Sequence, residues 1–409
     1  MSMAGSISSS TQWSTVAYHG MSALNKFDVI SSIGSAILLI VALGLVANYA
    51  VNPTPPMIHI TAHLSFSLPF MVCSAAGVIF SLLFSIQLIR HKDLKIAFER
   101  GIGQLVASSG CLQAKVRYAL HPARRRQALA NCQTASHSLT DDSGNVSRSV
   151  NFLTRDHVKL QGYWRFVDAG APTVIVFHGN GSNAEEMALF WGKIYGTLNY
   201  NFLCVEYRGF GLSDGVAGKS HQEMEAYFDA EAVLKFVLEA GVQKDTIIAH
   251  GSSLGGAYAT ALAHFYGIKF VILDHPFTSL AATIHHATPL SLGLAKQIVR
   301  ASYLEQHAPK DQTIPDAKDL KTDGFDSLKK MHLSQSQLFV IQGKKDHLMS
   351  EKFGEQLIQA AYPQDSLKQQ EYLTLVSKGH DLNAFFQDRS AQQKFLQFLR
   401  DNNLLISKD

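Results

Sequence analysis

The strongest constraint on the fold is an alternation of short apolar runs and helical patterns that begins near residue 148. A helical pattern starts near Ser220, where Ser220-x-x-Glu223 is a possible capping box, and another starts at Leu254. Strands buried on both faces are rich in β-branched and aromatic residues. By that criterion we predict buried strands at residues 173–177, 201–206, 246–249, 270–273, 338–341 and 372–376. The alternation predicts an α/β fold with a mostly parallel sheet covered by helices.

Three further segments complete this prediction. Residues 150–153 and 158–164 flank a short polar turn and predict an opening hairpin. Residues 280–336 interrupt the strand rhythm, which predicts a short cap inserted over the sheet. A last helix is expected at residues 382–399, with four phenylalanines as its core stripe.

The N-terminal part contains two long runs without a charged residue, at 29–51 and 64–89. Each exceeds the roughly 20 residues that a helix needs to cross a bilayer. We predict a transmembrane hairpin joined by the turn-rich segment that starts at Asn52. The alternatives are a signal peptide for the first run, or two buried helices of a larger core.

Positive charges follow the second run at Arg90, Lys92 and Lys95. The positive-inside rule places this flank, both termini and the C-terminal domain on the cytoplasmic side of an integral membrane protein. The expected organisation is a tail at 1–28, a membrane hairpin at 29–90, a basic linker at 91–147 and a catalytic domain at 148–409. The linker either lies on an anionic leaflet or is solvated.

The segment from Thr246 to Ala257 contains G-x-S-x-G as Gly251, Ser253 and Gly255. An apolar strand precedes the pentapeptide, and small residues typical of a tightly packed helix follow it. A serine on a strained strand-to-helix turn needs small neighbours on both sides. The pattern therefore predicts Ser253, and not the adjacent Ser252, as a catalytic nucleophile.

A serine nucleophile needs a base and a group that orients the base. In proteins with this kind of turn, the usual order of the three residues along the chain is serine, acid, histidine. His380 follows the predicted strand at 372–376, and Asp346 follows the one at 338–341. We predict His380 as the general base and Asp346 as the acid, with Asp274 at the end of the strand at 270–273 as the alternative acid.

Acyl transfer also needs donors for the developing oxyanion. The backbone N–H of Leu254, at the start of the helix, is one predicted donor. The backbone N–H of Asn180, in the loop after the strand at 173–177, is the other. His178 in the same loop is expected to brace it.

Other chemistries lack the residues they require. The segments at 209–214 and 213–220 each miss a glycine of the dinucleotide and phosphate loops, and His285-His286 lacks the spacing of a metal site. The four cysteines are scattered without C-x-x-C spacing, and a net charge of +3 does not indicate nucleic-acid binding. We expect no cofactor, no metal and no nucleic-acid partner.

Residues 148–400 resemble the α/β-hydrolase-domain proteins, especially membrane-anchored serine hydrolases that cleave lipid esters or remove palmitoyl groups from protein thiols. The motifs that carry the resemblance are FHGN at 177–180, EYRGFGLSDG at 206–215, the serine turn, PFTSL at 276–280, GKKD at 343–346 and GH at 379–380. Asp274-His275 departs from the family, whose members commonly have a glutamate and a small residue there. The resemblance implies an α/β-hydrolase fold and an esterase or thioesterase that acts on a lipid or acylated substrate at a membrane bilayer.

Three functions are compatible with this pattern. The first is hydrolysis of an ester or thioester through an acyl-enzyme. The second is acyl transfer on the same triad, with an alcohol or thiol in place of water. The third is a non-catalytic membrane protein that binds lipid or serves as a scaffold.

Overall fold

The computed structural model describes residues 138–405, apart from 142, 216–222, 289, 303–305, 378 and 381–382. These residues all belong to the second of two compact units into which the chain divides, residues 98–409. The predicted membrane runs at 29–51 and 64–89 and most of the basic linker lie outside the described residues. Among the helices that the structure describes, none has the length and apolar character needed to span a bilayer.

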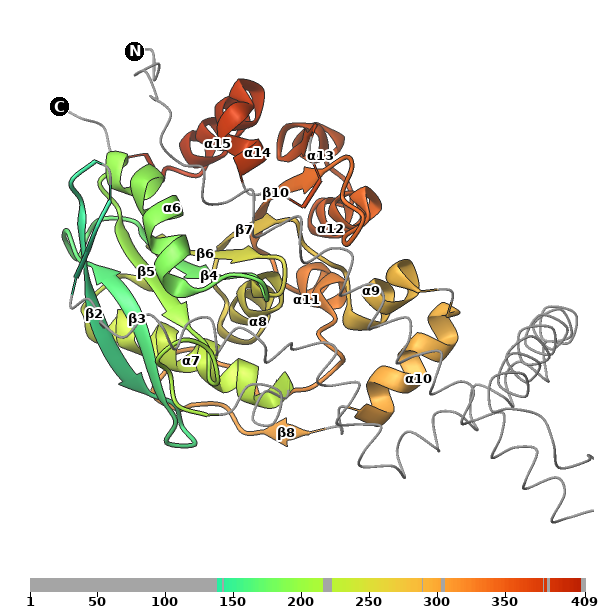
Figure 1. Ribbon diagram of the computed structural model, residues 1–409, viewed down its shortest axis with the longest axis horizontal. Coiled ribbons are helices and arrows are strands. Elements are labelled where there is room, and N and C mark those ends of the chain that lie inside the picture. The colour runs from blue at the N-terminus through green and yellow to red at the C-terminus, as the bar shows by residue number, and fades with distance from the viewer. Residues whose placement is uncertain are drawn as a thin grey trace, which may run out of the picture. The chain divides into compact units, whose positions relative to one another are not determined.

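The centre of the described unit is a twisted nine-stranded sheet (Figure 1). Its strands are β1 Ser138–Thr140, β2 Val146–Leu153, β3 Lys159–Arg165, β4 Thr173–Phe177, β5 Asn201–Glu206, β6 Ile247–Ser252, β7 Phe270–Asp274, β10 Gln337–Gly343 and β11 Leu373–Val376. The spatial order is β1-β2-β3-β5-β4-β6-β7-β10-β11. The six strands from β5 to β11 run parallel, and β1, β2 and β3 are antiparallel to their neighbours. The predicted α/β class with a mostly parallel sheet is therefore confirmed.

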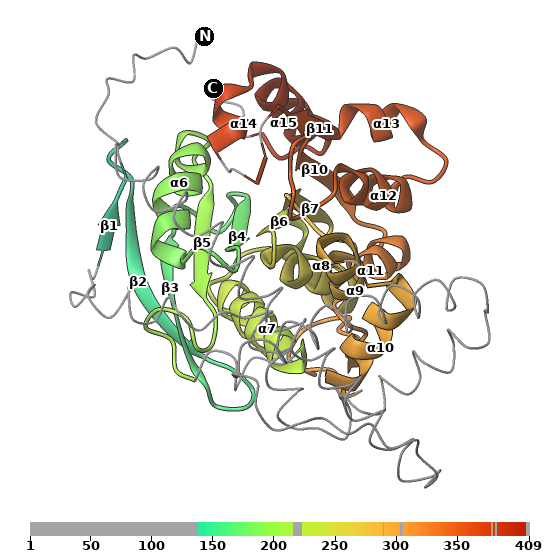
Figure 2. The same cartoon turned by 45° about the vertical axis from the view of Figure 1, so that its right-hand side comes forward.

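Helices cover both faces of this sheet. One face carries α6 and α15, and the other carries α7, α8, α11 and α12 (Figures 1 and 2). The described helices are α6 Ala184–Thr197, α7 Glu223–Glu239, α8 Gly255–Tyr266, α9 Leu280–Ala287, α10 Leu292–Ser302, α11 Ser327–Leu333, α12 Glu351–Ala361, α13 Ser366–Glu371, α14 Asn383–Gln387 and α15 Arg389–Asp401, with a 3₁₀ turn at Lys244–Thr246.

The predicted strands correspond closely to the observed ones. β4 and β5 have the predicted bounds, and the other four buried strands differ by one to three residues at an end. Every residue of β4, β5 and β6 is buried, which explains why continuous apolar runs located them. The sheet begins before residue 148, because β1 pairs with β2.

The prediction of a single helix at 382–399 is wrong in one respect, because the structure has two helices there, α14 and α15. Asp388 lies between them with an extended backbone, and its carboxylate accepts a hydrogen bond from the N–H of Ala391 at 3.0 Å. An aspartate that caps a new helix start stabilises the break. Three of the four predicted core phenylalanines, Phe385, Phe395 and Phe398, are buried as expected.

The predicted cap region contains α9, α10 and the small antiparallel pair β8 His307–Ala308 and β9 Leu320–Lys321. Its last helix, α11, packs against α8 and α12. α11 is therefore part of the helical layer over the sheet, and the inserted segment ends before it.

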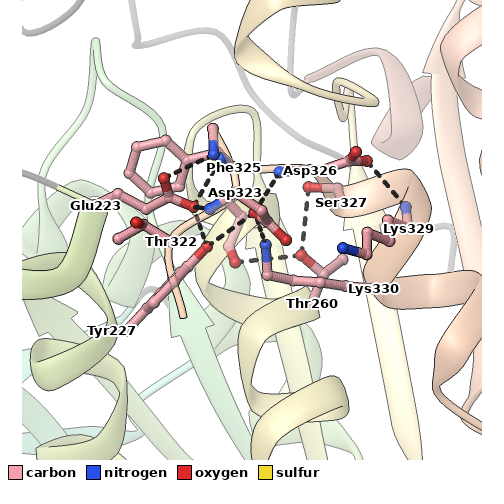
Figure 3. Close-up of polar contacts among 12 residues, drawn as sticks. Glu223, Tyr227, Thr260, Thr322, Asp323, Phe325, Asp326, Ser327, Lys329 and Lys330 are labelled. Atoms are coloured by element: carbon pink, nitrogen blue, oxygen red, sulfur yellow. Dashed lines mark hydrogen bonds and ion pairs between the residues drawn. The ribbon is translucent and has the colours of Figure 1, made fainter. Parts of the chain in front are cut away.

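A buried polar cluster fastens α7 to the segment that leads into α11 (Figure 3). The Glu223 carboxylate accepts hydrogen bonds from the backbone N–H groups of Asp323, Gly324 and Phe325 at 2.8–2.9 Å. The residue pairs are about a hundred positions apart in the chain, so this side chain is used for a long-range contact. Its predicted partner in a capping box, Ser220, lies outside the described residues.

Candidate active site

Ser253 lies on the turn between β6 and α8, as the pentapeptide predicted. Its φ of +51° is in the left-handed region, which is unusual for a residue with a side chain. The Ser253 N–H donates to the carbonyl of Asp274 at 2.8 Å, which ties the turn to the end of β7. A strained backbone held by its surroundings in this way is typical of functional sites.

Both glycines of the pentapeptide are required by packing. A Cβ on Gly251 would lie 2.3 Å from the carbonyl oxygen of Gly255, and a Cβ on Gly255 would lie 2.0 Å from that of Phe177. These distances are far inside van der Waals contact. The small residues therefore permit the close approach of β4, β6 and α8 that presents Ser253 at the strand ends.

His380 and Asp346 come from two neighbouring strand-end loops, after β11 and β10. His380 Nδ1 lies 2.7 Å from Asp346 Oδ2. The other carboxylate oxygen, Oδ1, accepts hydrogen bonds from the N–H groups of Leu348 and Met349 at 2.8 and 2.9 Å. The Asp346 side chain is fully buried, whereas 23% of the His380 side chain is exposed. The carboxylate is thus fixed beneath an imidazole that reaches the surface.

The environment of Asp346 favours its ionised form. Burial alone would raise the pKa of this carboxyl group, but the hydrogen bond with His380 and those from two backbone N–H groups outweigh burial and lower it. An ionised Asp346 accepts a hydrogen bond from Nδ1–H of His380. The other ring nitrogen, Nε2, is then left as the basic atom.

Asp274, the alternative acid, is buried and its carboxylate has different partners. Its Oδ2 accepts a hydrogen bond from Ser252 Oγ at 3.0 Å, and its Oδ1 lies 2.6 Å from His275 Nδ1. Among the described contacts, the carboxylate that meets His380 is therefore that of Asp346. The polar role of His275 was not anticipated from the sequence, where the only signal was an unusual histidine directly after the candidate acid.

The predicted oxyanion loop after β4 lies close to Ser253. A Cβ on Gly179 would lie 3.4 Å from the Cβ of Ser253. His178 is buried, with Nε2 3.1 Å from Glu206 Oε1 and its ring stacked on Tyr207 at 4.0 Å. Leu254 is the N-terminal cap residue of α8, where backbone N–H groups lack partners within the helix. Asn180 follows Gly179 directly. The two residues predicted to donate to the oxyanion, Leu254 and Asn180, are therefore each one position along the chain from a residue of this close approach, Ser253 or Gly179.

Two features lie away from this constellation. A cavity of about 590 Å³ at the β11 edge is lined by residues of α12, α13, β11 and α15, and not by Ser253, Asp346 or His380. In the part of the chain that the structure describes, no group of histidine, cysteine and acidic side chains is arranged to hold a metal ion.

The sequence model of the family described as "Serine aminopeptidase, S33" matches residues 171–334. Protein bem46 of Schizosaccharomyces pombe is 31% identical over 146 residues, which cover 34% of this chain and 48% of that protein. The uncharacterized membrane protein YNL320W of Saccharomyces cerevisiae is 27% identical over 159 residues, 38% of this chain and 55% of that protein. The chain thus matches about half the length of each. The Pyrococcus furiosus esterase Pf2001 aligns in structure with a TM-score of 0.43 and 21% identity, over 62% of this chain and 90% of the esterase.

Proposed function

We propose that this chain is a serine hydrolase of the α/β-hydrolase family that cleaves carboxylic esters or thioesters through an acyl-enzyme, which the family match over residues 171–334 supports. The proposed catalytic residues are Ser253, His380 and Asp346. The observation that carries the proposal is the 2.7 Å contact between His380 Nδ1 and Asp346 Oδ2. Both residues follow the carboxyl ends of parallel strands, as does Ser253 on its strained turn.

In the proposed reaction, His380 Nε2 takes the hydroxyl proton of Ser253 while Oγ attacks the carbonyl carbon of the substrate. The oxyanion that forms accepts hydrogen bonds from the N–H groups of Leu254 and Asn180. His380 then gives its proton to the departing alcohol or thiol, which leaves an acyl-serine. Water, deprotonated by the same nitrogen, releases the carboxylic acid and restores the serine.

We propose an acyl chain on a lipid or lipidated protein as the substrate. Two exposed leucines on loops that follow strands of the parallel sheet support apolar recognition: Leu348, two residues after Asp346, is 48% exposed, and Leu212, in the loop after β5, is 50% exposed. Anchoring through the uncharged runs at 29–51 and 64–89 would hold the enzyme at the surface where such substrates reside. One relative, YNL320W, is named a membrane protein.

A fluorophosphonate probe tests the nucleophile directly, because it reacts with an activated serine. We expect the full-length protein to be labelled in detergent and Ser253→Ala to lose the label. Ser390→Ala, which removes an exposed hydroxyl at the start of α15, should be labelled at the wild-type rate. Equal labelling of the wild type and Ser253→Ala would show that Ser253 is not the reactive group, and the proposal would fail.

The proposed topology places residues 98–409 on the cytoplasmic side. The protein is expressed with a C-terminal tag in a bacterial host. We expect the tag to survive protease treatment of intact spheroplasts and to be cleaved once their membrane is permeabilised. A cytosolic and a periplasmic reporter in the same cells show that the membrane is sealed and that the protease is active. Cleavage of the tag in intact spheroplasts would contradict the orientation, and recovery of the protein in the soluble fraction would contradict anchoring.

A further inference from the structure

A second aspartate–histidine pair lies beside the proposed catalytic one. Asp274 and His275, at the end of β7, are 1% and 2% exposed, and His275 Nδ1 is 2.6 Å from Asp274 Oδ1. The other ring nitrogen, Nε2, is 3.0 Å from the carbonyl oxygen of Gly379. Gly379 directly precedes His380, and the rings of His275 and His380 lie 5.2 Å apart at 71°.

The partners of His275 define its protonation. A carbonyl oxygen only accepts hydrogen bonds, so Nε2 must carry a hydrogen to bond Gly379. The 2.6 Å contact with Asp274 also needs a hydrogen, because a ring lone pair facing a carboxylate at that distance would be repulsive. The pair therefore holds two hydrogens, as imidazolium and carboxylate or with the shared proton nearer to Asp274. A neutral imidazole beside an ionised Asp274 satisfies only one of the two contacts.

The surrounding charges support the protonated form. Among the described residues, the titratable groups facing His275 are Asp274 at the end of β7, Asp346 from the loop after β10 and His380 from the loop after β11. Burial alone would lower the pKa of His275, but the two carboxylates and the Gly379 carbonyl raise it above its ordinary value. The backbone is fixed as well, since the His275 N–H donates to the Ile341 carbonyl at 2.8 Å and φ is +49°.

The same pair is also bonded to the nucleophile turn. Asp274 accepts a hydrogen bond from Ser252 Oγ through its side chain and from the Ser253 N–H through its carbonyl. On the opposite side, Gly379 fits so tightly that a Cβ there would lie 2.9 Å from the Lys345 carbonyl oxygen. The pair thus connects the serine turn to the backbone that carries His380.

We propose that His275 is a positioning residue that sets the place of His380 by donating from Nε2 to the Gly379 carbonyl, with Asp274 holding its second proton. This inference rests on the proposed function of Ser253 and His380. It adds an alkaline limit to the activity. When the pair loses one of its two hydrogens, the one that remains lies on Nδ1 and bonds the Asp274 carboxylate, so Nε2 no longer donates and Gly379 is released. Catalysis then declines.

The test compares two side chains at position 275 in the full-length protein. His275→Leu removes the donor, whereas His275→Gln keeps an N–H of similar reach that does not titrate. Neither leucine nor glutamine is branched at Cβ, so the two variants experience the same backbone strain at φ +49°. His307→Gln, which changes a largely exposed histidine outside the site, is the matched control.

With p-nitrophenyl butyrate between pH 5 and 10, we expect His275→Leu to lower kcat about 10–100-fold, the size of a small misplacement of a catalytic group. KM should change little. His275→Gln should recover most of kcat at pH 7 and lose the alkaline decline that the wild type and His307→Gln share. Equal losses in both 275 variants, or an alkaline decline that persists in His275→Gln, would overturn the inference.

Nitrogen-15 NMR of histidine-labelled protein provides a measurement independent of turnover. At pH 8 we expect the signal of an imidazole with both nitrogens protonated that is present in the wild type and in Ser253→Ala and absent from His275→Gln. A singly protonated His275 would overturn the inference even if the Leu variant failed to fold. Loss of Ser253-dependent labelling in the wild type would instead overturn the proposed function, and the positioning role with it.

Discussion

Ser253→Ala and His380→Ala are each expected to lower kcat for p-nitrophenyl butyrate by about 10⁴-fold or more, and the double variant should be no slower than either one. The reason is that a hydroxyl without its base, or a base without its hydroxyl, contributes almost nothing to acyl-enzyme formation. Asp346→Asn should also be strongly impaired, because it replaces the acceptor at Nδ1 of His380 with an amide and changes the tautomer that is favoured. Burst and steady-state kinetics measure these effects.

The two candidate acids serve as controls for one another. Asp274→Asn weakens the support of Gly379 but leaves the Asp346–His380 contact in place, so its loss should be much smaller than that of Asp346→Asn. A larger loss of activity in Asp274→Asn than in Asp346→Asn would identify Asp274 as the acid. Multiplicative losses in the Ser253 and His380 double variant would mean that the two side chains act independently and would contradict a shared mechanism.

Local patterns located the sheet and the serine turn well. Buried parallel strands are continuous apolar runs, and the turn that carries Ser253 has a spacing that packing enforces, since neither Gly251 nor Gly255 has room for a Cβ. The order of residues along the chain allowed two aspartates, Asp346 and Asp274, as the partner of His380. Which carboxylate meets the imidazole depends on how loops after β7, β10 and β11 converge, and that convergence is not encoded in any short window of sequence.

Polar side chains with distant partners were the residues that the sequence could not interpret. Glu223 fits a capping box by spacing, yet its carboxylate binds three backbone N–H groups of residues 323–325. His275 likewise gave no sign that it would bond a carbonyl 104 positions away. A buried polar group needs a partner, but its identity follows from tertiary packing alone.

The cluster around Glu223 leads to the second large effect, which concerns stability. Lys330 on α11 is 1% exposed, with Nζ 2.5 Å from Asp323 Oδ1 and over the ring of Tyr227 at 5.1 Å (Figure 3). We expect Lys330→Met to lower the free energy of unfolding by about 3–5 kcal/mol, because it leaves the carboxylates of Asp323 and Glu223 buried without their cation. Urea unfolding followed by tryptophan fluorescence measures this loss.

The control is Lys329→Met, at the preceding residue of the same helix. Its side chain is exposed, and its loss should lower the free energy of unfolding by about 0.5 kcal/mol or less. Adding Asp323→Asn to Lys330→Met should recover part of the stability, since the unpaired charge is then gone. Burial alone would raise the pKa of Asp323, but Lys330 lowers it below the ordinary value. Its stabilising effect is therefore present above about pH 4 and is lost as the pH falls through the folded-state pKa. The difference in stability between the wild type and Lys330→Met should narrow over the same pH range. A Lys330→Met protein as stable as Lys329→Met at neutral pH would show that the buried ion pair contributes little to the stability of the fold.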